Sequence, residues 1–124
     1  MIKTKKEIKI TSECDKSGIE TLFLHDLADF PGKNKKLRTF SLAELEVGGE
    51  VEFHIHENEF ESYYIISGSG IYNDNGKEIP ISAGSVTFTP SGSGHGIKNT
   101  GKDKLVFIAL IILDWINNWY SGGM

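Results

Sequence analysis

Apolar and polar residues alternate along much of the chain, and this alternation predicts short β-strands. A strand over residues 38–47 places Arg38, Phe40, Leu42 and Glu44 on one face and Thr39, Ser41, Ala43 and Leu45 on the other. Ile8 and Ile10 alternate with charged neighbours in residues 5–11, which predicts an edge strand with one covered face. Residues 105–113 are continuously apolar, and a run of this kind predicts a strand buried on both faces.

Glycine-rich and polar turns separate the predicted strands. Residues 48–49 and 68–70 contain the small side chains that sharp bends require. Asn75-Gly76 lies between two apolar segments and is a strong β-hairpin signal. Many short strands joined by such turns indicate an all-β barrel or sandwich.

Four side chains in the middle of the chain can converge on one metal ion. His54 and His56 are two residues apart, so a β-strand places both imidazoles on one face. Glu61 follows a polar turn and opens the next apolar run. His95 comes after residues 89–94, whose proline and glycines suit a turn that brings a later strand back towards the first pair.

The spacing of these residues resembles the two conserved motifs of the cupin family. The first motif reads Gly48, five residues, His54-Ile55-His56, four residues, Glu61, six residues and Gly68, and the second reads Gly84, five residues, Pro90-Ser91-Gly92, two residues, His95, three residues and Asn99. The resemblance implies a six-stranded β-barrel core of the jelly-roll, or double-stranded β-helix, type. It also implies that the three histidines and Glu61 are metal ligands, whereas the glycines, Pro90 and Asn99 shape turns.

Imidazole nitrogens and a carboxylate oxygen form a borderline ligand set. Such a set suits one divalent ion of iron, manganese, nickel, zinc or copper, and the spacing does not choose among them. No cysteine takes part, which argues against a closed structural zinc site. Four protein donors on an ion that prefers about six leave roughly two positions for water, oxygen or a chelating substrate.

Three further residues are candidates for lining a pocket beside the metal. Strand parity places Glu52 on the histidine face, opposite Val51, and Tyr63 on the Glu61 face, although Tyr63 can equally be a core residue. Arg38 presents a fork of donors that can clamp a carboxylate or phosphate, and its alternative is a solvated strand end. Structural or solvent-exposed positions are expected for His25, Cys14, Lys33, Lys35 and Lys36.

The chain length of 124 residues favours one domain with one hydrophobic core. We expect N-terminal strands within residues 5–25, a barrel core at about residues 36–113 and a tail at residues 114–124. In that tail Trp115 and Trp119 are four residues apart, which predicts a short helix with one aromatic face.

The formal net charge of −4 disfavours nucleic acid or an anionic membrane as a partner. The longest apolar run, residues 105–113, is much shorter than the roughly 20 residues that a membrane-spanning helix needs. The basic N-terminus is not followed by the apolar segment of a secretory signal. A single cysteine, Cys14, cannot form an internal disulfide, so we expect a cytoplasmic protein.

The resemblance implies a function as well as a fold. We expect a metal-dependent enzyme acting on a small oxygenated metabolite, of the dioxygenase or sugar or sugar-phosphate isomerase type. The alternative is a non-enzymatic module that binds a sugar or another small ligand. We also expect a homodimer, because Ile8, Ile10, Trp115 and Trp119 supply apolar surface that a single barrel does not fully cover.

Overall fold

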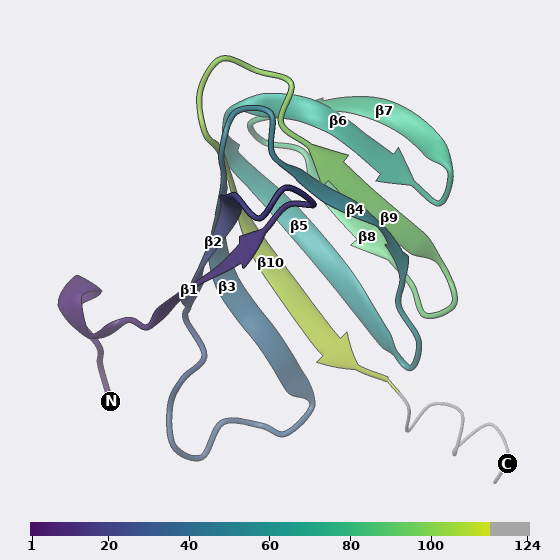
Figure 1. Cartoon of the computed structure of the whole chain (residues 1–124). Helices are drawn as coiled ribbons and strands as arrows, with labels where there is room; N and C mark the ends of the chain where they lie inside the picture. Colours follow the sequence, from purple (N-terminus) through teal and green to yellow (C-terminus); the bar gives the residue numbers. More distant parts are fainter. Residues whose placement is uncertain (115–124) are drawn as a thin grey trace, which may run out of the picture.

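The computed structural model describes residues 1–114, which form two antiparallel β-sheets packed face to face (Figure 1). These residues contain one turn of 3-10 helix, η1 (Lys5–Glu7), and the strands β1 (Ile10–Cys14), β2 (Glu20–Asp26), β3 (Leu37–Leu45), β4 (Glu50–Ile55), β5 (Glu59–Ser67), β6 (Ser69–Asp74), β7 (Lys77–Ser82), β8 (Val86–Thr89), β9 (Gly94–Lys98) and β10 (Leu105–Leu113). One sheet has the strand order β1-β2-β3-β10-β5-β8 and the other β4-β9-β6-β7. The predicted all-β architecture is confirmed.

The hydrophobic core lies between the two sheets and is built from alternate residues of their strands. Burial in β3 follows this alternation, because Ala43 and Leu45 are fully buried and Glu44 between them is only partly buried. The core residues are Leu22, Ala43, Leu45, Tyr63, Ile65, Tyr72, Ile81, Ile97, Leu105, Phe107 and Ala109. Most of them come from β3, β5, β9 and β10, so the centre of each sheet contributes to one packed interior.

Two strand predictions need correction. Residues 105–113 do form β10, but only one face is buried: Phe107 is buried, whereas Ile108 points outward and is only partly covered. Residues 5–7 form a helical turn instead of a strand, because the Thr4 backbone N–H and hydroxyl both donate to the Glu7 carboxylate, at 3.1 and 2.8 Å.

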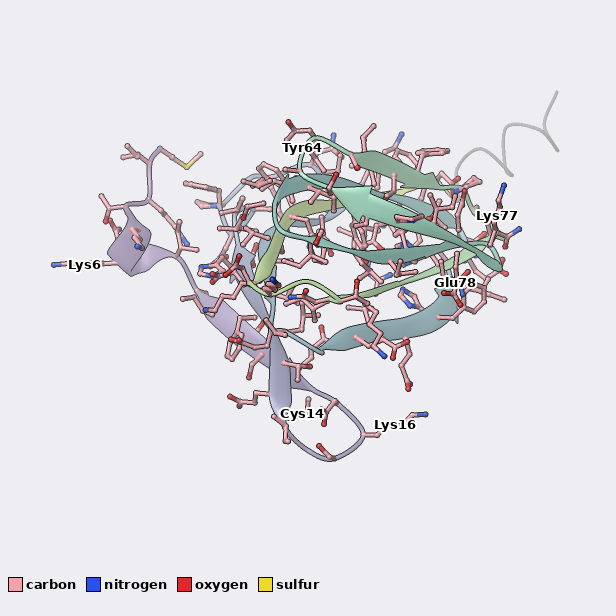
Figure 2. All side chains as sticks on the ribbon, turned by 90° about the horizontal axis from the view of Figure 1, so that it is seen from above. Lys6, Cys14, Lys16, Tyr64, Lys77 and Glu78 are labelled. Atoms are coloured by element: carbon pink, nitrogen blue, oxygen red, sulfur yellow. The ribbon has the colours of Figure 1, made fainter. Side chains whose placement is uncertain are left out.

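The predicted hairpin between β6 and β7 is confirmed. Asn75 and Gly76 both have positive φ angles, 51° and 102°, as a tight two-residue turn requires. The β1–β2 hairpin, with Cys14 and Lys16 near its tip, projects from the body of the molecule (Figure 2). Within residues 1–114 no helix is long and apolar enough to cross a membrane. The predicted C-terminal helix, with Trp115 and Trp119, lies outside the described residues.

Candidate metal centre

The paired histidines come from β4, which carries a bulge immediately before them. Val51 and His54 each pair with a residue of β9, but the two residues between them, Glu52 and Phe53, oppose a single residue there. An extra residue of this kind shifts the alternation of side chains. Val51 therefore packs against the core on the same side as the histidines, and the predicted placement of Val51 on the opposite face is wrong.

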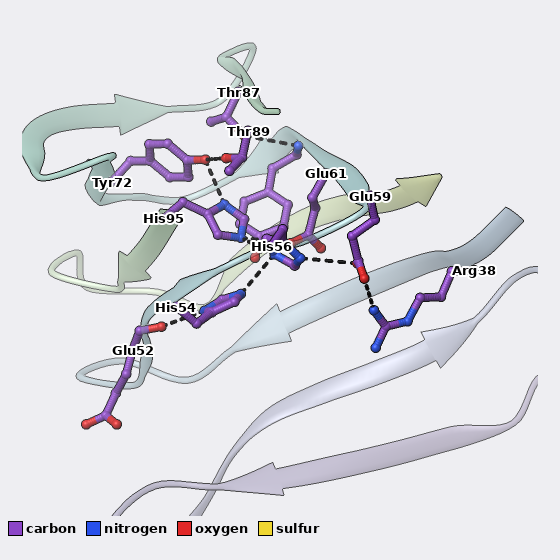
Figure 3. Close-up of polar contacts among 11 residues, drawn as sticks. Arg38, Glu52, His54, His56, Glu59, Glu61, Tyr72, Thr87, Thr89 and His95 are labelled. Carbon is purple, nitrogen blue, oxygen red and sulfur yellow. Dashed lines mark hydrogen bonds and ion pairs between the residues drawn. The ribbon is translucent and has the colours of Figure 1, made fainter. Parts of the chain in front are cut away.

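The same bulge turns the Glu52 side chain away from the histidines, so its predicted strand face is also wrong. Its carboxylate forms an ion pair with Lys16 of the β1–β2 hairpin at 3.0 Å. Figure 3 shows this carboxylate pointing away from the histidine cluster. Only the backbone carbonyl of Glu52 takes part in the cluster, where it accepts a hydrogen bond from His54 Nδ1 at 2.7 Å.

Strand β5 supplies Glu61 from its inward face. Glu59, Glu61, Tyr63 and Ile65 are all buried, and the residues between them are more exposed. The predicted alignment of Glu61 with Tyr63 is therefore confirmed. The strand begins at Glu59, two residues earlier than the sequence pattern suggested, and Glu59 consequently joins the same buried face.

His95 lies on β9, directly opposite His54, and its side chain is completely buried. The turn before β9 is bound to the other histidine strand: the Gly92 backbone N–H donates to the His56 carbonyl at 2.7 Å, and the His56 N–H donates to the Ser93 carbonyl at 3.1 Å. Gly92 has a φ of +88°, which favours glycine at this point of the turn. The turn thus brings His95 back to the first pair, as the sequence predicted.

The four predicted ligand side chains meet at one point, with every donor atom within 4.8 Å of the others. His56 Nε2 lies 3.0 Å from His54 Nε2 and 3.0 Å from His95 Nε2. The Glu61 carboxylate oxygen Oε1 lies 2.8 Å from both His56 Nε2 and His95 Nε2. The three imidazole rings are evenly spaced, with centroids 4.7, 4.8 and 4.9 Å apart.

These separations match the donor spacing of a six-coordinate metal ion. Donor bonds of about 2.1 Å that meet at right angles place neighbouring donors about 3.0 Å apart, whereas tetrahedral bonds of the same length place them about 3.4 Å apart. The 2.8–3.0 Å separations of His56 from the other three donors, and of His95 from Glu61, agree with the first value. These separations are therefore compatible with four donors around one metal ion.

The second ring nitrogen of each histidine, Nδ1, contacts its own separate partner outside the cluster (Figure 3). His54 Nδ1 donates to the Glu52 carbonyl, and His56 Nδ1 donates to the Glu59 carboxylate at 3.2 Å. His95 Nδ1 lies 2.8 Å from the Tyr72 hydroxyl. Carbonyl and carboxylate oxygens can only accept, so Nδ1 carries the proton in His54 and His56. In a neutral imidazole this leaves Nε2 as a lone pair that faces the centre of the cluster.

Converging lone pairs need a cation between them. Nitrogen lone pairs about 3.0 Å apart, with the Glu61 carboxylate beside them, repel one another. A shared proton relieves this repulsion for one pair at a time, whereas a metal ion bonds to all four donors at once. The arrangement is therefore suited to hold a metal ion.

Two buried tyrosines support the cluster from behind. Burial and then the nearby Glu61 charge raise the pKa of Tyr63 well above its usual value, and burial also raises the pKa of Tyr72. Both phenols therefore keep their protons. The Tyr72 hydroxyl lies 2.9 Å from Thr89 Oγ1 as well as near His95, so it can accept from the histidine and donate to the threonine. The Tyr63 ring packs against the His95 ring, with 5.0 Å between the two ring centroids.

Sequence reasoning missed Glu59, Tyr72 and Thr89. Extending the alternation of β5 backwards by two residues would have placed Glu59 on the Glu61 face.

Arg38 does reach this region, but its guanidinium contacts Glu59 behind His56. His25 lies apart from the cluster and pairs with Glu44 at 2.6 Å. Cys14 is an exposed free thiol.

Comparison with known proteins gives one family model and several relatives. A family model described as a cupin domain matches residues 41–111. An oxalate-binding protein of Thermotoga maritima is 51% identical over 80 residues, which cover 64% of this chain and 66% of that protein. A Thermotoga maritima crystal structure described as a predicted oxalate decarboxylase is 41% identical with a TM-score of 0.81, covering 91% of this chain and 99% of that chain.

A more distant curated relative is an oxalate decarboxylase of Bacillus subtilis, which is 30% identical over 110 residues. That match covers 81% of this chain but only 28% of the decarboxylase. The matched segments thus span just under two thirds of the first curated relative and about a quarter of the second.

Proposed function

Because this chain belongs to the cupin family, we propose that His54, His56, Glu61 and His95 hold one divalent transition-metal ion and that the protein binds a small chelating dianion of the oxalate type through it. The observation that carries this proposal is the convergence of four electron-pair donors, each 2.8–3.0 Å from at least one other, with the Nδ1 nitrogen of each histidine occupied by another partner.

A metal ion in this site would supply a positive Lewis-acid centre with about two positions free of protein donors. The residues of the chain set the conditions around it. Glu61 contributes one negative charge and the three neutral histidines contribute none, so a divalent centre keeps a net charge of about +1. Tyr63 and Tyr72 stay neutral in the buried wall and add no negative charge. These features favour an anion with two adjacent oxygens, and oxalate is the anion in the names of two curated relatives.

The first prediction is that oxalate binds only to the metal-loaded protein. Oxalate is expected to raise the melting temperature of the metal-loaded protein and to leave the metal-free protein unchanged. A ligand at 100 times its Kd adds about 2.7 kcal/mol of stability, which is readily seen in a thermal-shift assay. Acetate is the matched control, because a single carboxylate cannot chelate in the same way. An equal shift with and without metal would contradict the proposal.

Enzymatic turnover is the second candidate function, and the match to an oxalate decarboxylase favours it. The same metal-loaded sample can be assayed for loss of oxalate and for release of formate. Sugar phosphates and oxygen consumption should be assayed beside it, to test the isomerase and dioxygenase types expected from the sequence. Binding without turnover assigns the chain to the binding class, whereas turnover assigns it to the enzymes.

We also propose that the protein is a homodimer whose contact is the outer face of the six-stranded sheet. One row of this face consists of Leu42, Ile108, Tyr64 and Val86, side by side on β3, β10, β5 and β8. Tyr64 is 52% exposed and Val86 is 73% exposed. An uncharged row of this length is complementary to a second copy of itself.

The dimer prediction is tested by sedimentation at micromolar concentration. The wild type is expected to sediment as a dimer and the Tyr64→Glu variant as a monomer, because the new carboxylates would face each other in an apolar contact. Wild-type protein that sediments as a monomer would contradict the prediction.

A further inference from the structure

We propose that Glu59 and Arg38 are positioning residues for the metal centre. In this inference Arg38 holds Glu59, and Glu59 holds His56 in the tautomer that directs its Nε2 lone pair at the ion. The inference rests on the proposed metal binding, and it assigns a role to two residues that are not among the four metal donors.

Glu59 is buried, with only 6% of its surface exposed, and both of its oxygens are used. Oε2 accepts from His56 Nδ1 at 3.2 Å, and Oε1 accepts from the Arg38 guanidinium. A buried carboxylate is costly unless its charge is compensated. Arg38 supplies the compensating charge, and His56 uses the remaining oxygen.

Arg38 reaches Glu59 because β3 is irregular at this point. Thr39 pairs with Ile111 and Leu37 pairs with Ile112, so the ladder between β3 and β10 shifts at Arg38. In the sheet β10 separates β3 from β5, and Glu59 pairs with the last residue of β10, Leu113. The Arg38 side chain therefore crosses β10 close to the end of that strand to meet Glu59, which a long and partly exposed side chain can do.

His56 is the donor for which this support matters most. Its Nε2 lies within 3.0 Å of the donor atoms of His54, His95 and Glu61. Among the three histidines of the cluster it is the one whose Nδ1 meets a carboxylate, since His54 meets a backbone carbonyl and His95 a phenol. A carboxylate on Nδ1 fixes the tautomer and makes Nε2 a better donor, and loss of such a partner typically costs 10–100-fold in metal affinity.

The rival explanation is that Arg38 and Glu59 form an ion pair that only closes the end of the sandwich. The two explanations differ in how the residues depend on each other. If Arg38 acts through Glu59, removing Arg38 has no further effect on metal affinity once Glu59 has lost its charge. If the ion pair is only structural, substituting Arg38 or Glu59 should leave the metal affinity unchanged.

The test is a double-mutant cycle read by competition of Zn²⁺ or Mn²⁺ with a chelator. Glu59→Gln is expected to raise the metal Kd by about 10–100-fold. Arg38→Gln is expected to raise it by up to about 10-fold, and the double variant should match Glu59→Gln within about 2-fold. Arg38→Lys keeps the charge and should retain most of the affinity. Lys104→Gln, which removes an ion partner of Glu44 and Glu46 on the surface, is the matched control.

A second readout does not depend on metal binding. In metal-free protein at about pH 8, where ordinary histidines are neutral, nitrogen NMR should show the Nδ1–H tautomer of His56 in the wild type and a gain of the Nε2–H tautomer in Glu59→Leu. His25 provides an internal reference in both samples. The same His56 tautomer in the wild type and in Glu59→Leu would overturn the proposal. So would a double variant whose loss of metal affinity equals the sum of the losses in Arg38→Gln and Glu59→Gln, expressed as free energies. A wild type that binds no metal but shows the tautomer change would overturn the proposed function and leave Glu59 as the residue that orients His56.

Discussion

Replacing His56 by alanine is expected to weaken divalent-metal binding by well over 100-fold. The reason is geometric, because His56 Nε2 is the donor atom that lies next to all three others, at 2.8–3.0 Å. Its removal would take away one of the four proposed metal donors and one of the two partners of the buried Glu59 carboxylate. The loss of metal affinity should therefore exceed the roughly 10–100-fold that is typical when a residue contacts a metal-binding side chain but not the metal itself.

His25→Ala is the matched control for this experiment. It also removes an imidazole, but His25 pairs with Glu44 away from the cluster. Metal affinity measured by chelator competition should stay within about 2-fold of the wild type in this variant, as for a surface change that leaves a site intact. Similar affinities for the His56→Ala and His25→Ala variants would show that metal binds elsewhere.

Gly68→Ala is expected to lower the free energy of unfolding by about 2–5 kcal/mol, the largest loss of stability that we predict. Gly68 has a φ of +89°, which costs a residue with a Cβ about 1–2 kcal/mol. The added Cβ would also lie 2.6 Å from the Lys104 carbonyl oxygen and 3.0 Å from Leu105 Cα, and both atoms belong to the backbone. Overpacking of this kind adds about 1–3 kcal/mol.

Gly84→Ala separates the two causes. Gly84 has a nearly identical φ of +91°, but a Cβ there would meet nothing within 4 Å. Its substitution should cost only the conformational part, about 1–2 kcal/mol. Denaturant unfolding of both variants measures the difference. Equal losses of unfolding free energy would mean that the backbone around Lys104 moves to accept the added Cβ at residue 68 without an energetic cost.

Strand alternation and turn chemistry were sufficient to predict most of the fold. They located β3 and β10, the β6–β7 hairpin and the turn before His95, because each depends on local side-chain patterns. The family resemblance added the convergence of the four metal donors, which alternation alone leaves open. The structure brings these four together as expected.

Apart from residues 5–7, which form a helical turn instead of a strand, the wrong predictions concern strand faces. Two of these faces were misplaced because a bulge cannot be seen in an alternating pattern. The extra residue at Glu52 and Phe53 reverses the parity that placed Glu52 beside the histidines. A similar irregularity at Arg38 lets its side chain reach Glu59. β10 was predicted to be buried on both faces, but an apolar run does not reveal whether another layer covers its outer side.

The most direct test of the metal centre is elemental analysis of the protein purified without a chelator or a metal-binding affinity tag, beside the His56→Ala and His95→Ala variants. We predict about one divalent transition-metal ion per wild-type chain and little or none in either variant. The same low and sub-stoichiometric content in all three proteins would contradict the assignment of His54, His56, Glu61 and His95 as a metal site.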